Sequence, residues 1–442
     1  MNTEAATLKF GPIALSPGIS RLNASAFMLA SFITIGFMIF INIGNAYVLN
    51  ENLGIPQREQ GGVTGLFLII NEISLLILMP VAGILSDRIG RRTVMVGGLL
   101  IMALGYVLYP LATSIPELVV YRALFAAGVA GATGMLGTIT HDYPQEQSRG
   151  KMIALSSIMI VLGSLFVADV FRRLPGIFQD RGMDGITAGQ YTFWIAAAAI
   201  TVSCIALRLG LKGGTPAEPE DRPPLNVLVK SGLKHAKNPR IALAYAAAFI
   251  GRSDLVILGS FTVLWGMMAG LDRGMGTAEA VKSGTMLFIM ANISALFWSY
   301  CIGLIIDRCN RVTALAIGTG LGAIGFIAMG LVDDPLAPAA IPFIIMLGIG
   351  QISCFSTAQA LIGQEAPVKE RGAVLGTFGL CGAIGIMIAT GVGGWLFDHW
   401  MYAGPFVLVG VANAVIVVLA IIVRLKSPGM MPAGRIAARD AI

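Results

Sequence analysis

Twelve long apolar runs constrain this chain of 442 residues more than any other feature. A hydrocarbon core about 30 Å thick requires roughly 20 apolar residues in each helix that crosses it. The runs do not alternate apolar and polar residues, as the strands of an outer-membrane barrel would. We therefore predict an all-α membrane protein with twelve transmembrane helices. The predicted helices lie at about 24–49, 61–85, 93–113, 116–140, 151–171, 190–209, 241–268, 283–306, 312–332, 340–363, 372–397 and 402–424.

The composition supports this prediction and excludes several other classes of protein. Hydrophobic residues make up 56% of the chain and charged residues only 12%, whereas a soluble protein is about 25% charged. The net charge of +6 is spread over a largely apolar chain, so we expect no nucleic-acid partner. Neither a phosphate-binding loop nor a cluster with metal-ligand spacing occurs in the sequence. We therefore predict that the protein is not an enzyme and has no metal or cofactor.

The distribution of lysine and arginine predicts how the chain crosses the membrane. With the N-terminus inside, 22 of the 30 basic residues lie on the inner side and six on the outer side. Basic residues accumulate in the cytoplasmic loops of membrane proteins. We therefore expect a multi-pass protein of the bacterial inner membrane with both termini in the cytoplasm.

One long polar stretch divides the predicted helices into two groups of six. Residues 210–240 are rich in glycine, proline and charge, which is typical of a linker, with a short surface helix at 225–236. We predict a cytoplasmic N-terminal segment, a first six-helix bundle, a cytoplasmic linker, a second six-helix bundle and a cytoplasmic tail. Their predicted bounds are 1–23, 24–209, 210–240, 241–424 and 425–442.

Two pairs of similar loops indicate that the halves are repeats. The sequence GILSDRIGRR at 83–92 matches GLIIDRCNR at 303–311. The sequence PQEQSRG at 144–150 matches PVKERG at 367–372. The offset from Gly83 to Gly303 is nearly the same as that from Arg149 to Arg371, and both are close to half the length of the chain. Internal repeats of this kind are typical of secondary transporters, which bind substrate near the midplane where the repeats meet.

The stretch from Gly83 to Arg92 closely resembles the loop signature of the major facilitator superfamily. The twelve spans, the central linker and the degenerate second copy of the signature extend the resemblance over nearly the whole chain. The resemblance implies two pseudo-symmetric six-helix bundles that rock about a central cavity and open it to each side of the membrane in turn. It leaves the substrate open.

The same resemblance implies a cytoplasmic gate at the two signature loops. In the family this cluster holds the cytoplasmic side closed while the protein is open outward. The alternative is that the arginines only set the topology. The second copy lacks the Gly-Arg-Arg ending, so we expect an asymmetric gate. The predicted gate residues are Gly83, Asp87, Arg88, Arg91 and Arg92, with Asp307, Arg308 and Arg311 as the weaker counterpart.

Three charged residues lie near the middle of predicted spans, where a charge costs roughly 2.5–3.5 kcal/mol on insertion scales. Glu72 is a candidate proton carrier, with a structural hydrogen bond or ion pair as the alternative. Arg252 and Asp254 are two positions apart, so they point to nearly opposite faces of a helix and need different partners. Because an arginine stays charged, Arg252 must meet a carboxylate, carbonyl groups or an anionic substrate.

Arg122 lies near the outer end of the fourth span. It resembles the coupling arginine of drug–proton antiporters in this superfamily, which a glycine follows four residues later. Here position 126 is alanine, and the glycine is Gly128. The fifth span also lacks the glycine-proline pair of those antiporters, which favours symport slightly.

Neutral polar residues complete the predicted substrate cavity. Asn42 and Asn45 share one face of the first span, and Asn292 and Gln351 lie deep in later spans. Hydrogen bonding between helices is the alternative role for each of them. At the outer end of the fifth span, Asp169 can pair with Arg172, and we expect Arg173 to extend its charge toward the interface.

We therefore predict a monomeric secondary transporter, driven by the proton gradient, whose partners are protons, the lipid bilayer and a small organic solute. The deep arginines and asparagines favour an anionic or amphipathic solute. Alternatives of the same fold are a drug or metabolite antiporter that acts in efflux, and a lipid flippase. A sensor that has lost transport is a further alternative.

Overall fold

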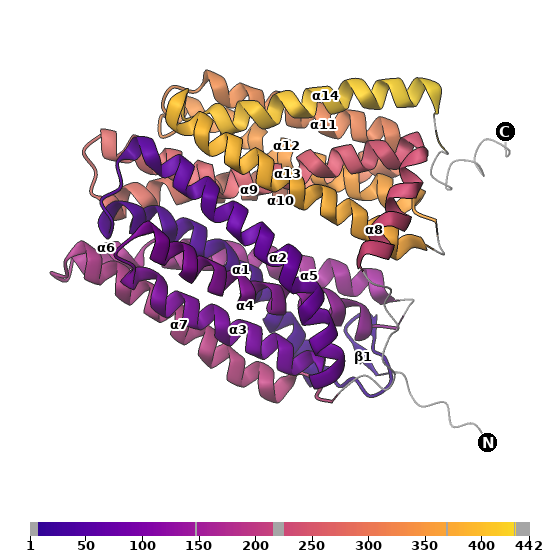
Figure 1. Cartoon of the computed structure of the whole chain (residues 1–442), viewed down its shortest axis with the longest axis horizontal. Coiled ribbons are helices and arrows are strands. Elements are labelled where there is room, and N and C mark those ends of the chain that lie inside the picture. The colour runs from indigo at the N-terminus through magenta and orange to yellow at the C-terminus, as the bar shows by residue number, and fades with distance from the viewer. Residues whose placement is uncertain (1–7, 146–147, 215–224, 368–369, 428, 430–442) are drawn as a thin grey trace. The chain divides into compact units, whose positions relative to one another are not determined.

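A computed structural model describes residues 8–145, 148–214, 225–367, 370–427 and 429, apart from the side chains of a few helix residues, Asp87 among them. Twelve of its helices are long and apolar enough to cross a membrane, which confirms the predicted number of spans and the all-α fold (Figure 1). The first six are α1 (Arg21–Glu51), α2 (Gln60–Ile89), α3 (Arg91–Leu108), α4 (Ile115–Asp142), α5 (Arg149–Phe171) and α7 (Gly185–Gly210). The other six are α9 (Pro239–Asp272), α10 (Thr277–Arg308), α11 (Arg311–Ala328), α12 (Ile341–Glu365), α13 (Arg371–His399) and α14 (Gly404–Lys426).

The helices form two compact units. The first comprises Met1–Gly54 and Ile70–Asp221, and the second comprises Ile55–Ile69 and Arg222–Ile442. The first third of α2 therefore groups with the second unit. Within that unit, the carboxylate of Asp398 in α13 accepts hydrogen bonds from the backbone N–H groups of Gly61, at 2.8 Å, and Gly62. A carboxylate at this position satisfies N–H groups that the first turn of a helix leaves free.

The internal repeat is visible in matching elements. Helix α3 is followed at once by the 3₁₀ turn Tyr109–Leu111, and α11 is followed at once by the 3₁₀ turn Met329–Leu331. Both helices are 18 residues long, and their first residues, Arg91 and Arg311, are separated by the same offset as Gly83 and Gly303. Each begins within the last residues of one copy of the signature, so the sequence repeat corresponds to a structural repeat at this position.

Glycines allow helix backbones to pack closely at equivalent places in the two units. A Cβ atom on Gly163 of α5 would lie 1.7 Å from the carbonyl oxygen of Phe32 in α1. A Cβ atom on Gly385 of α13 would lie 1.7 Å from the carbonyl oxygen of Phe249 in α9. In lipid no hydrophobic force draws apolar helices together, so such close backbone contacts supply much of the packing energy.

Side-chain caps define where several helices begin. Ser20 and Asn23 form a reciprocal capping box at the start of α1, in which the Ser20 Oγ accepts from the Asn23 N–H at 3.1 Å. Asp184 caps α7 by accepting from the Thr187 N–H at 3.0 Å. Asn238 and Asn310 cap α9 and α11 in the same way. Each cap satisfies a backbone donor at the point where the chain enters a helix.

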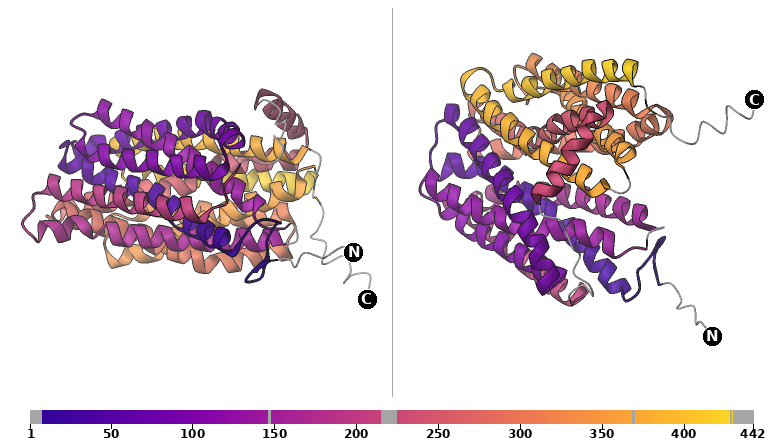
Figure 2. Two further views of the ribbon diagram at one scale, coloured as in Figure 1. Left: turned by 90° about the horizontal axis from the view of Figure 1, so that it is seen from below. Right: turned by 45° about the vertical axis from the view of Figure 1, so that its right-hand side comes forward.

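Two small elements lie at helix ends. The hairpin of β1 (Lys9–Phe10) and β2 (Ile13–Ala14) packs on the first unit, because Leu15 pairs with Pro144 and the Ala14 N–H donates to the Ser148 Oγ at 3.0 Å. Helix α8 (Leu225–Lys234) matches the predicted linker helix and lies at the end of the second unit (Figure 2). The Ser231 hydroxyl and the His235 ring contact the Glu370 carboxylate, which joins the linker to the start of α13.

Substitution of Gly385 tests the close packing of α9 and α13. The Gly385→Ala variant should lower the free energy of unfolding by about 1–3 kcal/mol, because the added methyl group overlaps a backbone carbonyl oxygen. Gly376→Ala is the matched control in the same helix, since nothing lies within 4 Å of its Cβ position. That control should keep or raise stability by up to about 1 kcal/mol. Equal thermal unfolding of both variants in detergent would contradict the packing argument.

The contact between α8 and α13 should depend on pH. The hydrogen bond with His235, followed by that from Ser231, holds the pKa of Glu370 below its usual value. The contact therefore stabilises the protein above the unfolded-state pKa of about 4.3 and loses this effect as the pH falls through the folded-state value. The melting temperature of Glu370→Gln should be below that of the wild type at pH 7, and the difference should shrink toward pH 3. A difference that is constant with pH would rule this out.

Candidate functional site

Among the cations of the first unit whose side chains the structure describes, Arg122 of α4 is the most deeply buried, with 2% of its surface exposed. Its Nη2 donates to the Oδ1 of Asn42 in α1, and the Tyr109 hydroxyl lies beside the guanidinium. The guanidinium carbon lies 5.8 Å from the centre of the Phe125 ring, within cation–π range. Tyr109 donates in turn to the Oδ1 of Asn45, at 2.6 Å. The predicted residues Asn42, Asn45 and Arg122 thus belong to one polar network.

The network does not neutralise the charge of Arg122. Within the part of the chain that the structure describes, Arg122 forms no ion pair, and its Nε and Nη1 atoms are buried without a hydrogen-bond partner. An arginine cannot lose its proton in a protein. The site therefore combines a permanent positive charge with unused donors, which is an arrangement that suits an anion.

Aromatic rings surround this network and keep it dry. Phe40 of α1 stacks on Tyr106 at 5.7 Å between ring centres, and Tyr109 stacks on Phe193 of α7 at the same distance. The Tyr106 hydroxyl donates to the backbone carbonyl of Phe37. Electrostatic interactions are strengthened where water is excluded.

The second unit contains a buried acid, Asp254 of α9, whose side chain is fully buried. The Nδ2 of Asn413 in α14 lies 3.3 Å from each of its carboxylate oxygens. The Cys354 thiol of α12 donates to the Oδ1 of Asn413 at 3.2 Å and also adjoins Asp254. Among the described residues no cation pairs with Asp254. Its carboxyl group therefore meets only neutral hydrogen-bonding groups.

Glycines of α11 make room for this cluster. A Cβ atom on Gly322 would lie 2.2 Å from the Cys354 Sγ and 3.4 Å from the Asn413 amide. The carbonyl of Gly318, one turn earlier, lies 3.5 Å from the same Sγ. The polar side chains from α9, α12 and α14 can thus meet because α11 presents bare backbone to them.

Arg252 lies on a different face of α9 from Asp254, as the spacing predicts. Its Nη1 donates to the carbonyl of Gly379 in α13, at 3.3 Å. A Cβ atom on Gly382 would lie 2.2 Å from the Arg252 Cδ, so that glycine accommodates the alkyl part of the side chain. Of the three kinds of partner considered for Arg252, the structure shows a backbone carbonyl, and Arg252 and Asp254 have separate partners.

The positions of the other predicted cavity residues do not indicate a specific role. Glu72 is 7% exposed in the part of α2 that belongs to the first unit, and it is engaged in an interaction there. Asn292 donates to the carbonyl of Phe288 in its own helix at 2.9 Å, and Gln351 is 5% exposed. Their role in a cavity stays a prediction.

Two of the predicted gate arginines, Arg91 and Arg92, have partners within the first unit. Arg91 forms an ion pair with Asp142 of α4. Arg92 donates through Nη1 to the carbonyls of Arg208, at 3.1 Å, and Leu211, at 3.4 Å. Arg88 is exposed, and the carbonyl of Gly83 accepts from the Ser86 hydroxyl.

The side chain of Asp87 lies outside the described residues. In the second copy of the signature, Arg311 lies 3.7 Å from the carboxylate of Asp307 one turn earlier in the chain. Arg308 is exposed. The role of both loops as a gate therefore stays a prediction.

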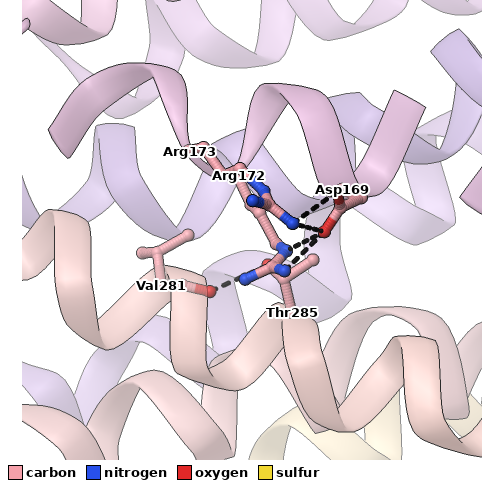
Figure 3. A network of polar contacts seen from close by, with 5 residues as sticks. All are labelled: Asp169, Arg172, Arg173, Val281 and Thr285. Carbon is pink, nitrogen blue, oxygen red and sulfur yellow. Dashed lines mark hydrogen bonds and ion pairs between the residues drawn. The ribbon is translucent and has the colours of Figure 1, made fainter. Parts of the chain in front are cut away.

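The cluster at the end of α5 contains one contact that was not predicted (Figure 3). Arg172 pairs with Asp169 as predicted, with 3.0 Å between its Nε and the Oδ1. The Nη2 of Arg173 also lies 2.7 Å from the Asp169 Oδ2, because positions i and i+4 share a helix face. The Arg173 side chain is 53% exposed, and its extension toward the membrane interface stays a prediction.

The sequence reasoning missed three members of the two networks. Asn413 is the only amide side chain in the last apolar run, and that isolation was a usable signal. Tyr109 and Cys354 carried no such signal, because tyrosine and cysteine are common in apolar helices.

Comparison with known proteins gives the family. The family model described as Major Facilitator Superfamily matches residues 26–388 and 287–437, which together cover most of the chain. The chain belongs to the major facilitator superfamily. It is therefore a secondary transporter and an integral multi-pass membrane protein, and the family is one of transporters rather than enzymes.

Two relatives and one solved structure show the range of this family. The magnetosome protein MamH of Paramagnetospirillum magneticum is 29% identical over 408 residues, covering 89% of this chain and 90% of MamH. The magnetosome protein MamZ of the same organism is 26% identical over 390 residues, covering 84% of this chain but only 58% of MamZ. The nucleoside transporter NupG has the same fold, with a TM-score of 0.72 at 14% identity over 91% of this chain and 99% of NupG.

Substitution of Arg122 separates its structural role from a role in transport. Arg122→Met removes a buried charge whose described partners are neutral and keeps a similar volume, so stability should be unchanged or higher. Transport should fall at least tenfold if the charge serves the solute. The checks are the melting temperature in detergent and solute uptake into proteoliposomes. A destabilised variant with proportionate loss of folded protein would show that the arginine is structural.

Proposed function

We propose that this transporter couples proton movement to the transport of a small anionic or amphipathic organic solute. The observation that carries the proposal is the Asp254 cluster, a fully buried carboxyl group among neutral partners inside a membrane span. Ionisable residues inside membrane spans typically mark ion and proton pathways. In this proposal the first unit binds the solute, and the second unit binds the proton.

The contacts of Asp254 suit a group that changes its protonation state. No ion pair with a described residue has to break when the carboxyl group gains or loses a proton. The Asn413 side chain carries both an NH₂ donor and a carbonyl acceptor, so it can hydrogen-bond to the carboxylate and to the neutral acid. The Cys354 thiol is a weak donor that adjusts to either form.

The contacts of Arg122 suit the solute. The guanidinium offers two nitrogen atoms, Nε and Nη1, whose N–H groups have no partner among the described residues, in a buried aromatic environment. A carboxylate or a similar anion would receive charge-assisted hydrogen bonds there. The surrounding Phe and Tyr rings would contact the apolar part of an amphipathic molecule. Arg122 thus supports both the charge and the amphipathic character that we propose for the solute.

The direction of transport gives a second candidate function. Arg122 occupies the helix in which antiporters of this superfamily carry their coupling arginine, which supports proton-driven efflux. The missing glycine-proline pair in α5 supports symport instead. Reversing the imposed pH gradient across proteoliposomes distinguishes the two, because symport and antiport accumulate solute at opposite signs of the gradient.

We also propose a place for the protein. The excess of basic residues on one side of the spans supports a bacterial inner membrane with cytoplasmic termini. The similarity to MamH and MamZ supports the magnetosome membrane as a second place to look. We propose that the working unit is a monomer of two bundles with bounds at 24–209 and 241–424, joined by the linker.

Substitution of Asp254 tests the proposed coupling. The solute is first identified by thermal stabilisation of the purified protein with a panel of organic acids, drugs and lipids. Asp254→Asn should then abolish solute accumulation driven by a pH gradient, because the amide cannot carry the proton. It should preserve exchange of labelled solute at equilibrium, which needs no net proton movement. Asp272→Asn, an exposed carboxylate in the same helix, is the control that should retain both activities. If Asp254→Asn accumulated as much solute as the wild type under a pH gradient, the proposal would be wrong.

A further inference from the structure

A cavity of about 270 Å³ lies at the end of the first unit that carries the N-terminal hairpin. It is open on one side and is lined by four segments: the residues after β2, the start of α3, the end of α4 and the residues after α7. None of the described contacts of the candidate transport residues Arg122 and Asp254 involves these segments. The charged residues of its lining are Arg91, Arg92, Asp142 and Lys212.

The charge of the lining is strongly unbalanced. Three cations, Arg91, Arg92 and Lys212, face a single carboxylate, that of Asp142. The ion pair between Arg91 and Asp142 accounts for that carboxylate. Arg92 and Lys212 are left without an acidic partner among the described lining residues. A pocket with two excess positive charges concentrates anions.

The Arg92 guanidinium is fixed by hydrogen bonds and retains an N–H donor that is not used. Its Nη1 is anchored by the backbone carbonyls of Arg208 and Leu211 at the end of α7. Its Nε is buried and has no hydrogen-bond partner in the described part of the chain. A Cβ atom on Gly213 would lie 2.5 Å from its Nη2, so a larger residue there would displace the guanidinium from this position. A fixed guanidinium with an unused donor is pre-organised to bind an oxyanion.

The surrounding backbone adds to this preference. Helix α3 begins at Arg91 with Gly90 as its N-cap, so no side chain caps its first turn. The free N–H groups and the dipole of a helix start favour an anion. Lys212 reaches the chain that follows the hairpin, where a Cβ atom on Gly18 would lie 3.2 Å from its Nζ. Gly18 has a φ of +77°, which glycine adopts without strain.

We propose that this cavity binds a phosphoryl group, supplied either as a soluble phosphate compound or as the headgroup of an anionic phospholipid. Guanidinium and ammonium groups around an uncapped helix start match the oxygens of a phosphate. Pockets for drug-sized ligands usually exceed roughly 300 Å³, so this smaller volume suits a small anion or a headgroup. The site lies at the end of the unit predicted to be cytoplasmic, where anionic lipids attract basic residues.

Binding to the purified full-length protein tests this proposal with inorganic phosphate as the soluble probe. The melting temperature in detergent is measured against phosphate at constant ionic strength, with chloride as the reference anion. The lipid arm uses nanodiscs of phosphatidylcholine with or without phosphatidic acid. Stabilisation by phosphate assigns the site to a soluble compound, and stabilisation by phosphatidic acid alone assigns it to a headgroup. Either result supports the cavity, whereas the absence of both would overturn it.

Variants of Lys212 locate the binding. Lys212 is exposed, so Lys212→Gln should leave the fold intact while weakening the anion about tenfold, as expected for a lost charge-assisted hydrogen bond. Lys212→Arg should restore most of the affinity. Lys151→Gln is the matched control, because Lys151 contacts the same hairpin through the Pro12 carbonyl but does not line the cavity. Equal weakening by the Lys212 and Lys151 substitutions would show general charge attraction and overturn the proposal.

Discussion

Close contact between helix backbones at glycine residues is the constraint on which the rest of this structure depends. Water drives apolar helices together in soluble proteins, but lipid does not, so transmembrane helices associate through fit. At Gly163 and Gly385 the fit is so close that a methyl group would overlap a carbonyl oxygen of the neighbouring helix. These contacts hold α1 against α5 and α9 against α13, at equivalent places in the two repeats.

The same property positions the polar side chains. The alkyl part of Arg252 packs against Gly382. The Cys354 thiol and the Asn413 amide pack against Gly322. Gly213 accommodates the Arg92 guanidinium beside the cavity. Each of these polar groups therefore lies beside a glycine of a neighbouring helix or loop. The space that the glycine leaves free is occupied by the polar side chain. This explains why few charges in a largely apolar chain can have defined geometry.

The two units use their buried charges differently. In the first unit a permanent cation, Arg122, meets asparagine, tyrosine and aromatic rings, and has donors left over. In the second unit a carboxyl group, Asp254, meets an amide and a thiol. A cation with spare donors suits an anionic solute, while an acid among neutral groups suits a proton. The two repeats thus surround buried groups of different chemical character.

The sequence by itself determined the number of spans, the repeat and the family, because these depend on apolar length, offset and a contiguous motif. It also indicated that Asn42 and Asn45 share a face and that Arg252 and Asp254 do not, since helical spacing decides this. The partners of these residues were decided only by the tertiary structure. Asn413 is far from Asp254 in the chain, and only the packing of α14 against α9 brings them together. Spacing along one helix carries no information about which neighbouring helix faces it, and that choice depends on where glycines let backbones approach.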